Sequence, residues 1–186
     1  MGSSAGVSQQ GAFGIASKFR ELGLTNDDIY VFDCCGRGDV VVLSKAGVGQ
    51  GNLQFQKQFN ALTERTEDLL RKVSPRRWLS LPVSYSDNAG FLACGIPAVA
   101  ITLLPSQEAT AYMRALQQNP SLEAAIMKST PPPNSKPLLP YQVQEKLPMT
   151  WRYLHTEYDN IASLTPESDS IMENLLDSLA HSRTPV

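Results

Sequence analysis

Three short segments of the chain carry side chains of the types that bind metals and ligands. Asp33 ends the apolar run of residues 29–32, and Asp87 precedes another apolar stretch. A carboxylate at the carboxyl end of a strand lies where open α/β sheets place their ligand contacts. His155 lies far downstream, and Asp159 is near enough in sequence to accept a hydrogen bond that would fix the tautomer of a zinc-binding imidazole. These residues are the candidates for a site.

Each candidate also has a purely structural interpretation. Asp33 could form the turn that leads to Gly36, and Asp87 could cap the start of a helix with its carboxylate oxygen. His155 could be a structural histidine among aromatic residues, and His181 is expected to be solvated. The sequence contains no HExxH, paired CxxC, P-loop or GxSxG motif, which excludes the enzymes most often recognised by such motifs.

The three cysteines, Cys34, Cys35 and Cys94, do not indicate a disulfide framework, because their number is odd and two of them are adjacent. All three lie in apolar sequence, which favours buried thiols. Neither histidine has the sequence context of a cysteine protease, so we do not expect a cysteine nucleophile.

The composition is typical of a globular protein. The chain has 186 residues, of which 42% are hydrophobic and 18% charged, and its net charge is -2. These values fit one domain with a substantial core and exclude a fully disordered chain. The 16 Lys and Arg residues do not outnumber the 18 Asp and Glu residues, which argues against a nucleic-acid-binding protein. The one basic cluster is expected to be a solvated helix end and loop, and it consists of Arg71, Lys72, Arg76 and Arg77.

No apolar run approaches the roughly 20 residues that a membrane-spanning helix needs, so we expect no membrane span. The N-terminus also lacks the charged and then apolar pattern of a signal peptide. The sequence determines neither the compartment nor the oligomeric state.

Hydrophobic periodicity predicts the helices. Apolar residues at helical spacing predict helices at about 10–22, 55–73 and 109–128, the last one broken near residues 119–120. Thr165 and Pro166 predict the N-cap and the first residue of a final helix. That helix is expected to bury a stripe made of Ile171, Leu175 and Leu179.

Short apolar runs predict strands at 29–32, 40–43 and 97–104, and an extended segment at 78–83. The turn residues at 36–39 predict that the first two strands form a strand-turn-strand ribbon. Strands that alternate with helices indicate an α/β fold built in layers. The Pro-rich stretch at 131–140 cannot be helical. We predict a single domain, residues 1–186, with an insertion at about 105–148.

The candidate segments resemble those of a known family. Residues 31–39 (VFDCCGRGD) are similar to a strand-Asp-x-x-Gly-Arg-Gly-Asp segment, and residues 86–91 with 95–99 are similar to a Ser-Asp-His-x-x-Phe and Gly-Ile-Pro-Ala block. Residues 155–161 are similar to a His-Thr-x-x-Asp-Thr-Ile block. Their order resembles that of the co-catalytic zinc exopeptidases, which include aminopeptidase S, glutamate carboxypeptidase II and the transferrin receptor ectodomain. The resemblance covers most of residues 9–104 and 150–180.

The resemblance implies a three-layer sandwich with a mixed, mostly parallel central sheet. It makes Asp33 and His155 zinc ligands, one to each of two metals, and makes Asp87 and Asp159 supporting groups. Two zinc ions roughly 3.5–4 Å apart would polarise a peptide carbonyl and activate a bridging water. Tyr153 lies one position away from the tyrosine that the family places before its histidine ligand, which puts the oxyanion stabiliser in doubt.

The departures from the family pattern predict a loss of activity. Gln9 and Gln10 stand where the family has its Glu-Glu pair, and an amide cannot accept a proton from water at neutral pH. Losing a general base costs about 10²–10⁴ in rate. Asn88 replaces the histidine of the Ser-Asp-His block, and the family's upstream His-x-Asp and Asp-Asn-Ala-Ser-Gly blocks have no counterpart before residue 9.

We therefore expect a truncated or degenerate zinc-exopeptidase-like domain that is inactive as this polypeptide, with zinc bound weakly or not at all. Its partner would be a peptide substrate or another protein. Two alternatives stay open: an active metallo-aminopeptidase whose N-terminal part is missing from this chain, and a non-catalytic protein-binding α/β domain.

Overall fold

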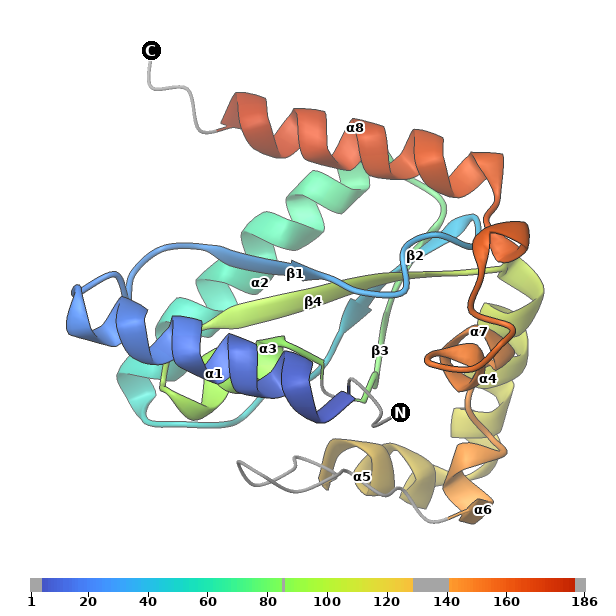
Figure 1. Ribbon diagram of the computed structural model, residues 1–186, viewed down its shortest axis with the longest axis horizontal. Coiled ribbons are helices and arrows are strands. Elements are labelled where there is room, and N and C mark those ends of the chain that lie inside the picture. Colours follow the sequence, from blue (N-terminus) through green and yellow to red (C-terminus); the bar gives the residue numbers. More distant parts are fainter. Residues whose placement is uncertain (1–4, 85, 129–140, 183–186) are drawn as a thin grey trace.

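The computed structural model describes residues 5–84, 86–128 and 141–182, over which the chain forms one four-stranded sheet surrounded by helices (Figure 1). The elements are, in chain order, α1 (Ala5–Glu21), β1 (Ile29–Phe32), β2 (Val40–Ser44), α2 (Leu53–Val73), β3 (Trp78–Leu81), α3 (Asn88–Ala93), β4 (Ala98–Leu104), α4 (Ser106–Gln118), α5 (Pro120–Lys128), α6 (Tyr141–Gln144), α7 (Met149–Tyr153), the 3-10 helix η1 (Ile161–Ser163) and α8 (Pro166–Ser182).

The sheet is mixed, with the strand order β1-β4-β2-β3. β1 pairs with β4 and β2 pairs with β3 in parallel, while β2 and β4 are antiparallel. The prediction of an α/β fold with a mixed, mostly parallel sheet is therefore confirmed. β4 is an inner strand between β1 and β2, and all seven of its residues are buried, as expected for an apolar strand with both faces covered.

The prediction that residues 29–32 and 40–43 pair as a ribbon is wrong, because β4 lies between these two strands. The chain leaves β1 and crosses over the carboxyl end of β4. At the crossing, Gly38 has φ 118°, and a Cβ there would lie 2.2 Å from the carbonyl carbon of Leu104. The Asp39 N–H then donates to the Leu104 carbonyl oxygen at 3.1 Å on the far side. Only glycine permits so close a crossing.

α2 and α8 cover one face of the sheet. The buried residues of this layer and of the strands beneath it form one cluster, consisting of Val41, Leu43, Phe55, Phe59, Leu62, Leu70, Val99, Ile101, Leu103 and Leu175. Ile171 packs against this cluster, so the predicted stripe of the last helix is confirmed at Ile171 and Leu175. Successive strand residues point to opposite faces, so β4 contributes Val99, Ile101 and Leu103 here and its other residues to the opposite face.

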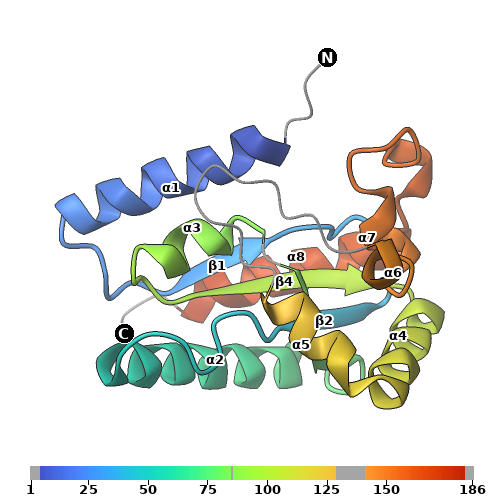
Figure 2. The ribbon, with the colours of Figure 1, turned by 90° about the horizontal axis from the view of Figure 1, so that it is seen from below.

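The opposite face carries two groups of helices. α1 and α3 pack over the start of β4 around Ala16, Phe91, Ile96 and Ala98. α4 and α5 pack against Val40, Val42, Leu81 and Leu104. Figure 2 shows α1 and α3 on one side of the sheet and α2 on the other, which gives the three layers.

The predicted helices are confirmed, including the break at residues 119–120, where α4 ends and α5 begins. α8 begins at Pro166 as predicted, but the Thr165 hydroxyl accepts a hydrogen bond from the Gly38 N–H at 3.0 Å. Thr165 therefore ties the last helix to the β4 crossing. The predicted insertion at 105–148 contains α4, α5 and α6, and its Pro-rich residues 131–140 lie outside the described residues.

The basic cluster at the end of α2 is exposed, as predicted. Arg71 pairs with Glu67 and Asp68 on its own helix.

Across the described ranges, no helix combines the length and the apolar composition needed to cross a membrane.

Candidate functional site

Two small chambers lie next to each other at the carboxyl end of β1, and Cys34 and Leu154 line both. We name the first the Trp151 chamber. It measures about 80 Å³, and its wall consists of Asp33, Cys34, Ser44, Val83, Ser84, Ser86, Ala100, Ile101, Thr102, Trp151 and Leu154. The second, the Tyr153 chamber, measures about 60 Å³ and is lined by Cys34, Gly36, Arg37, Thr150, Tyr153, Leu154, Tyr158, Asp159, Ser163 and Leu164.

Hydrogen bonds from β4 fix the turn at Asp33 and Cys34. The Asp33 N–H donates to the Ile101 carbonyl oxygen at 3.1 Å, which extends the β1–β4 pairing by one residue. Cys34 then adopts φ 53°. Its carbonyl oxygen accepts from the Leu103 N–H at 3.3 Å and from the Thr102 hydroxyl at 3.2 Å. A left-handed cysteine costs about 1–3 kcal/mol, and these bonds hold it in place.

Asp33 and Asp87 lie close enough to repel each other. Burial, and then the negative charge of Asp33, raise the pKa of the Asp87 carboxyl above its usual value. The prediction that Asp87 caps α3 is wrong, because its φ of -59° and ψ of -20° are helical and its side chain makes no capping bond. The Asn88 side-chain oxygen instead accepts from the Ser86 N–H at 3.1 Å.

The two adjacent thiols are protonated at neutral pH. Burial and the charge of Asp33 raise the pKa of Cys34, whose Sγ donates to Asp33 Oδ1 at 3.7 Å. The same two causes raise the pKa of Cys35 to about 12, and its Sγ donates to the carbonyl oxygens of Asp33 and Ile101, each at 3.4 Å. Since the thiolate is the nucleophile, the raised pKa values lower the nucleophilic reactivity of both cysteines.

His155 is exposed at the turn that follows α7, with φ 64°. Among the described residues, it and Cys34 are the non-glycine residues with positive φ, and both fall in candidate segments. The His155 N–H donates to Asp159 Oδ2 at 3.3 Å, so Asp159 orients the backbone at this position. Leu154 lines both chambers and Asp159 lines the Tyr153 chamber, whereas His155 is not among the lining residues of either one.

The Tyr153 chamber has an aromatic and charged wall. The rings of Tyr153 and Tyr158 lie 5.1 Å apart, and the Arg37 guanidinium lies 5.9 Å from the centre of the Tyr153 ring. Arg37 also lies 3.6 Å from Glu108. The Thr150 hydroxyl is buried without a hydrogen-bond partner among the described residues. Tyr153 is therefore at the site, as one of a pair of tyrosines.

Sequence reasoning singled out neither Arg37 nor the pair of Trp151 and Thr102. The Trp151 indole N–H donates to the Thr102 hydroxyl at 3.4 Å and so closes one chamber. A usable signal existed for Thr102, which is the one polar residue in the apolar run of β4.

Gln9 and Gln10 lie in the first half of α1.

The donor set at the chambers is incomplete for zinc. Asp33 and Asp87 supply neighbouring carboxylates, which are suitable ligands. Within residues 5–84, 86–128 and 141–182, no group of three or more His, Cys, Asp and Glu side chains is placed to hold a metal ion. Zinc sites in proteins normally have three or four protein ligands. The described side chains therefore do not by themselves form a zinc site.

Comparisons of this chain with protein-family models, with curated proteins and with solved structures found no match.

Proposed function

We propose that this chain is a zinc-exopeptidase-like domain that binds a peptide or a segment of another protein at the two chambers and does not hydrolyse it. One observation carries the proposal. Residues from the three segments that carry the family resemblance line the two adjoining chambers: Asp33 with Cys34, then Ser86, and then Tyr158 with Asp159. His155 is not among the residues that line either chamber.

The chambers suit two different groups of one bound chain. At about 80 and 60 Å³, each is smaller than the roughly 150 Å³ cavity that holds a benzene ring, so each has room for one small side chain or chain end. The Trp151 chamber offers Asp33 and hydroxyl groups, including that of Thr102, to amine and amide donors. The Tyr153 chamber offers tyrosine rings to a small apolar group.

The absence of hydrolysis follows from side-chain chemistry. By the resemblance, the general base would have to come from the position of Gln9 or Gln10, and an amide is not a base at neutral pH. Cys34 and Cys35 do not replace it, because burial and Asp33 keep their thiols protonated.

One observation favours the alternative of an active metallo-aminopeptidase whose N-terminal part is missing from this chain. Asp33 raises the pKa of Asp87, so two carboxylates share this end of the sheet, and a cation would relieve their repulsion. In that case Asp33 would bind zinc together with residues supplied by another part of the protein.

Binding of short peptides, followed by tryptophan fluorescence, tests the proposal. Leu154→Arg should abolish binding, because Leu154 lines both chambers. Leu176→Arg is the matched control, since Leu176 is 51% exposed on α8, away from both linings. Binding should persist in a metal chelator.

Activity assays separate the two candidates. The chain should release nothing above background from amino-acid anilides, and elemental analysis should find well under one zinc per chain. Zinc-dependent turnover that is lost in Asp33→Asn would contradict the proposal and support the enzyme.

A further inference from the structure

A cleft of about 530 Å³ lies at the opposite end of β1 and β4 from the two chambers. Three connections line it: the one between α1 and β1, the one that enters α2, and the one between α3 and β4. Its volume falls in the range of about 300–1,000 Å³ that is typical of small-molecule sites. The cleft shares no lining residue with the two chambers.

The lining is rich in carboxamides and, among the described residues, includes no Asp or Glu. We name it the amide cleft. Its polar side chains are Arg20, Thr25, Asn26, Gln50, Asn52, Gln54 and Gln58. Phe55 and Leu92 supply an apolar part of the wall. Such a lining favours a ligand with many hydrogen-bonding groups and a small apolar face.

Two hydrogen bonds within the wall occupy side-chain oxygens and leave amide donors. The Asn26 side-chain oxygen accepts from Gln58 Nε2 at 2.7 Å, and the Asn52 side-chain oxygen accepts from the Phe55 N–H at 2.9 Å. Both residues keep their NH₂ groups for a ligand. Arg20 is exposed and forms no ion pair with any residue that the structure describes. A ligand that fits this wall is rich in acceptors and carries negative charge.

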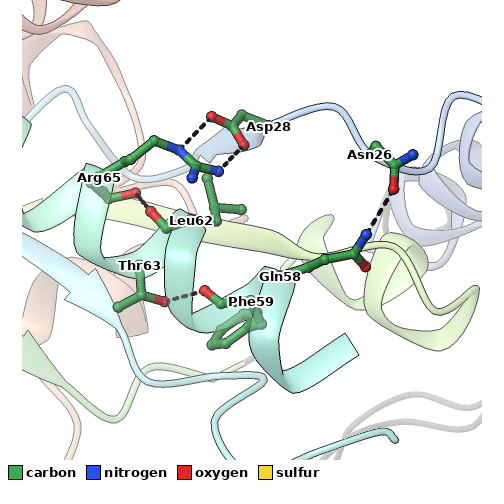
Figure 3. A network of polar contacts seen from close by, with 8 residues as sticks. Asn26, Asp28, Gln58, Phe59, Leu62, Thr63 and Arg65 are labelled. Atoms are coloured by element: carbon green, nitrogen blue, oxygen red, sulfur yellow. Dashed lines mark hydrogen bonds and ion pairs between the residues drawn. The ribbon is translucent and has the colours of Figure 1, made fainter. Parts of the chain in front are cut away.

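The wall is fixed before any ligand binds. Figure 3 shows Gln58 of α2 reaching Asn26, and Arg65 of the same helix holding the Asp28 carboxylate through two hydrogen bonds. The connection before β1 is therefore tied to α2 at two points. A preorganised wall lowers the entropic cost of binding.

We infer that the amide cleft binds a polyhydroxylated anion, that is, a sugar carrying one carboxylate or phosphate group. Arg20 pairs with the anionic group, and the amides of Asn52 and Gln54 bind hydroxyl oxygens. Neutral sugars lack the group that Arg20 recognises, and inorganic anions lack the hydroxyl groups that the amides recognise.

Titration of the labelled full chain with glucuronate, glucose 6-phosphate, glucose and inorganic phosphate tests the inference by NMR. The amide signals of Gly51, Asn52, Gln54 and Gly95 should shift with either sugar anion, at dissociation constants on the order of 1 mM. The two anions distinguish a carboxylate site from a phosphate site. Glucose should bind more weakly than either one.

Two exposed variants locate the contacts. Arg20→Ala should weaken sugar-anion binding about tenfold and leave glucose binding unchanged. Gln54→Ala should weaken both about threefold. Arg76→Ala and Gln117→Ala, at exposed arginine and glutamine positions outside the cleft, should change neither.

Two results would overturn the inference. One is the absence of shifts at the cleft with every sugar anion at about 50 mM, far above the expected dissociation constant. The other is equal binding of inorganic phosphate and glucose 6-phosphate, which would mean an adventitious ion only. Since the peptide-binding assay concerns the chambers at the other end of the sheet, each proposal can fail without the other.

Discussion

The indole N–H of Trp151 donates to the hydroxyl of Thr102 at 3.4 Å, and this contact connects α7 to the central strand of the sheet. The Thr102 hydroxyl donates in turn to the Cys34 carbonyl oxygen at 3.2 Å. One polar side chain in an apolar strand thus connects the turn after β1 with the helix that closes the Trp151 chamber. Thr102 is 4% exposed, so these bonds have little competition from water.

Thr102→Val is therefore expected to lower the free energy of unfolding by about 1–2 kcal/mol, because it removes the acceptor of the half-buried Trp151 N–H. Urea unfolding followed by Trp151 emission, in a Trp78→Phe background, measures the change. Thr110→Val is the control, since the exposed Thr110 hydroxyl donates to the carbonyl of its own helix. Its effect should stay within about 0.5 kcal/mol. Equal losses in both variants would show that the Trp151 contact contributes nothing.

Two helical glycines should respond in opposite ways to the same substitution. Gly14 lies on the exposed side of α1, and a Cβ there would have nothing within 4 Å. Gly14→Ala should raise the free energy of unfolding by roughly 0.5–1 kcal/mol, because alanine favours the helix. A Cβ at Gly90 would lie 2.8 Å from the backbone of Ala12 and Phe13, so Gly90→Ala should force α3 away from α1 and cost about 1–3 kcal/mol.

Thermal unfolding of both glycine variants by circular dichroism checks this prediction. The pair controls for helix propensity, since the two substitutions are the same and both positions lie in helices. Stabilisation by both would mean that α1 and α3 do not pack as closely as described.

Periodicity predicted the elements well because burial decides them locally. In α2, Phe55, Phe59 and Leu62 mark one face of the helix, and all three are buried. Strand order was not predictable in this way. Residues 29–32 and 40–43 form strands that follow one another in the sequence, yet β4 lies between them in the sheet. β4 is apolar on both faces, so it suits an inner position that helices cover on both sides.

The sequence pointed to segments around the chambers and did not indicate the contacts between them. The resemblance selected Asp33 and Asp87, and electrostatics couples these two residues. No local pattern indicates that Trp151 reaches Thr102, because that contact joins residues 49 positions apart. The capping alternative for Asp87 does not hold because residue type indicates only a capping preference, while the backbone angles decide whether a cap forms.

The adjacent thiols should resist alkylation in the folded protein. Burial and Asp33 raise the pKa of Cys35 to about 12, from a usual 9.0, so its thiolate fraction is about a thousandfold lower than in the unfolded chain. Cys34 is shifted in the same direction by the same causes. Mass spectrometry after a short iodoacetamide pulse at pH 8 should find the peptide with both cysteines unmodified, and fully modified in urea.

Asp33→Asn provides the matched test of the cause. It removes the charge that opposes thiolate formation and keeps the side-chain shape, so alkylation of Cys34 should speed up measurably while burial still limits it. Alkylation of the native wild type as fast as in urea would mean that the thiols are neither buried nor shifted.

Asp87 should make the protein less stable as the pH rises. Burial and Asp33 raise its folded-state pKa above the usual 3.8, so the native state binds this proton more tightly than the unfolded chain does. Its stabilising contribution is therefore present below pH 3.8 and is lost as the pH rises through the raised pKa.

Asp87→Asn should match the wild type in acid and be more stable at neutral pH, by well under about 1 kcal/mol because the side chain is partly exposed. Urea unfolding across this pH range measures the difference, and Asp27→Asn, an exposed control before β1, should follow the wild type. In Asp33→Asn the pKa of Asp87 should fall, which NMR titration detects. A stability difference that is constant with pH would rule out charge repulsion between the two carboxylates.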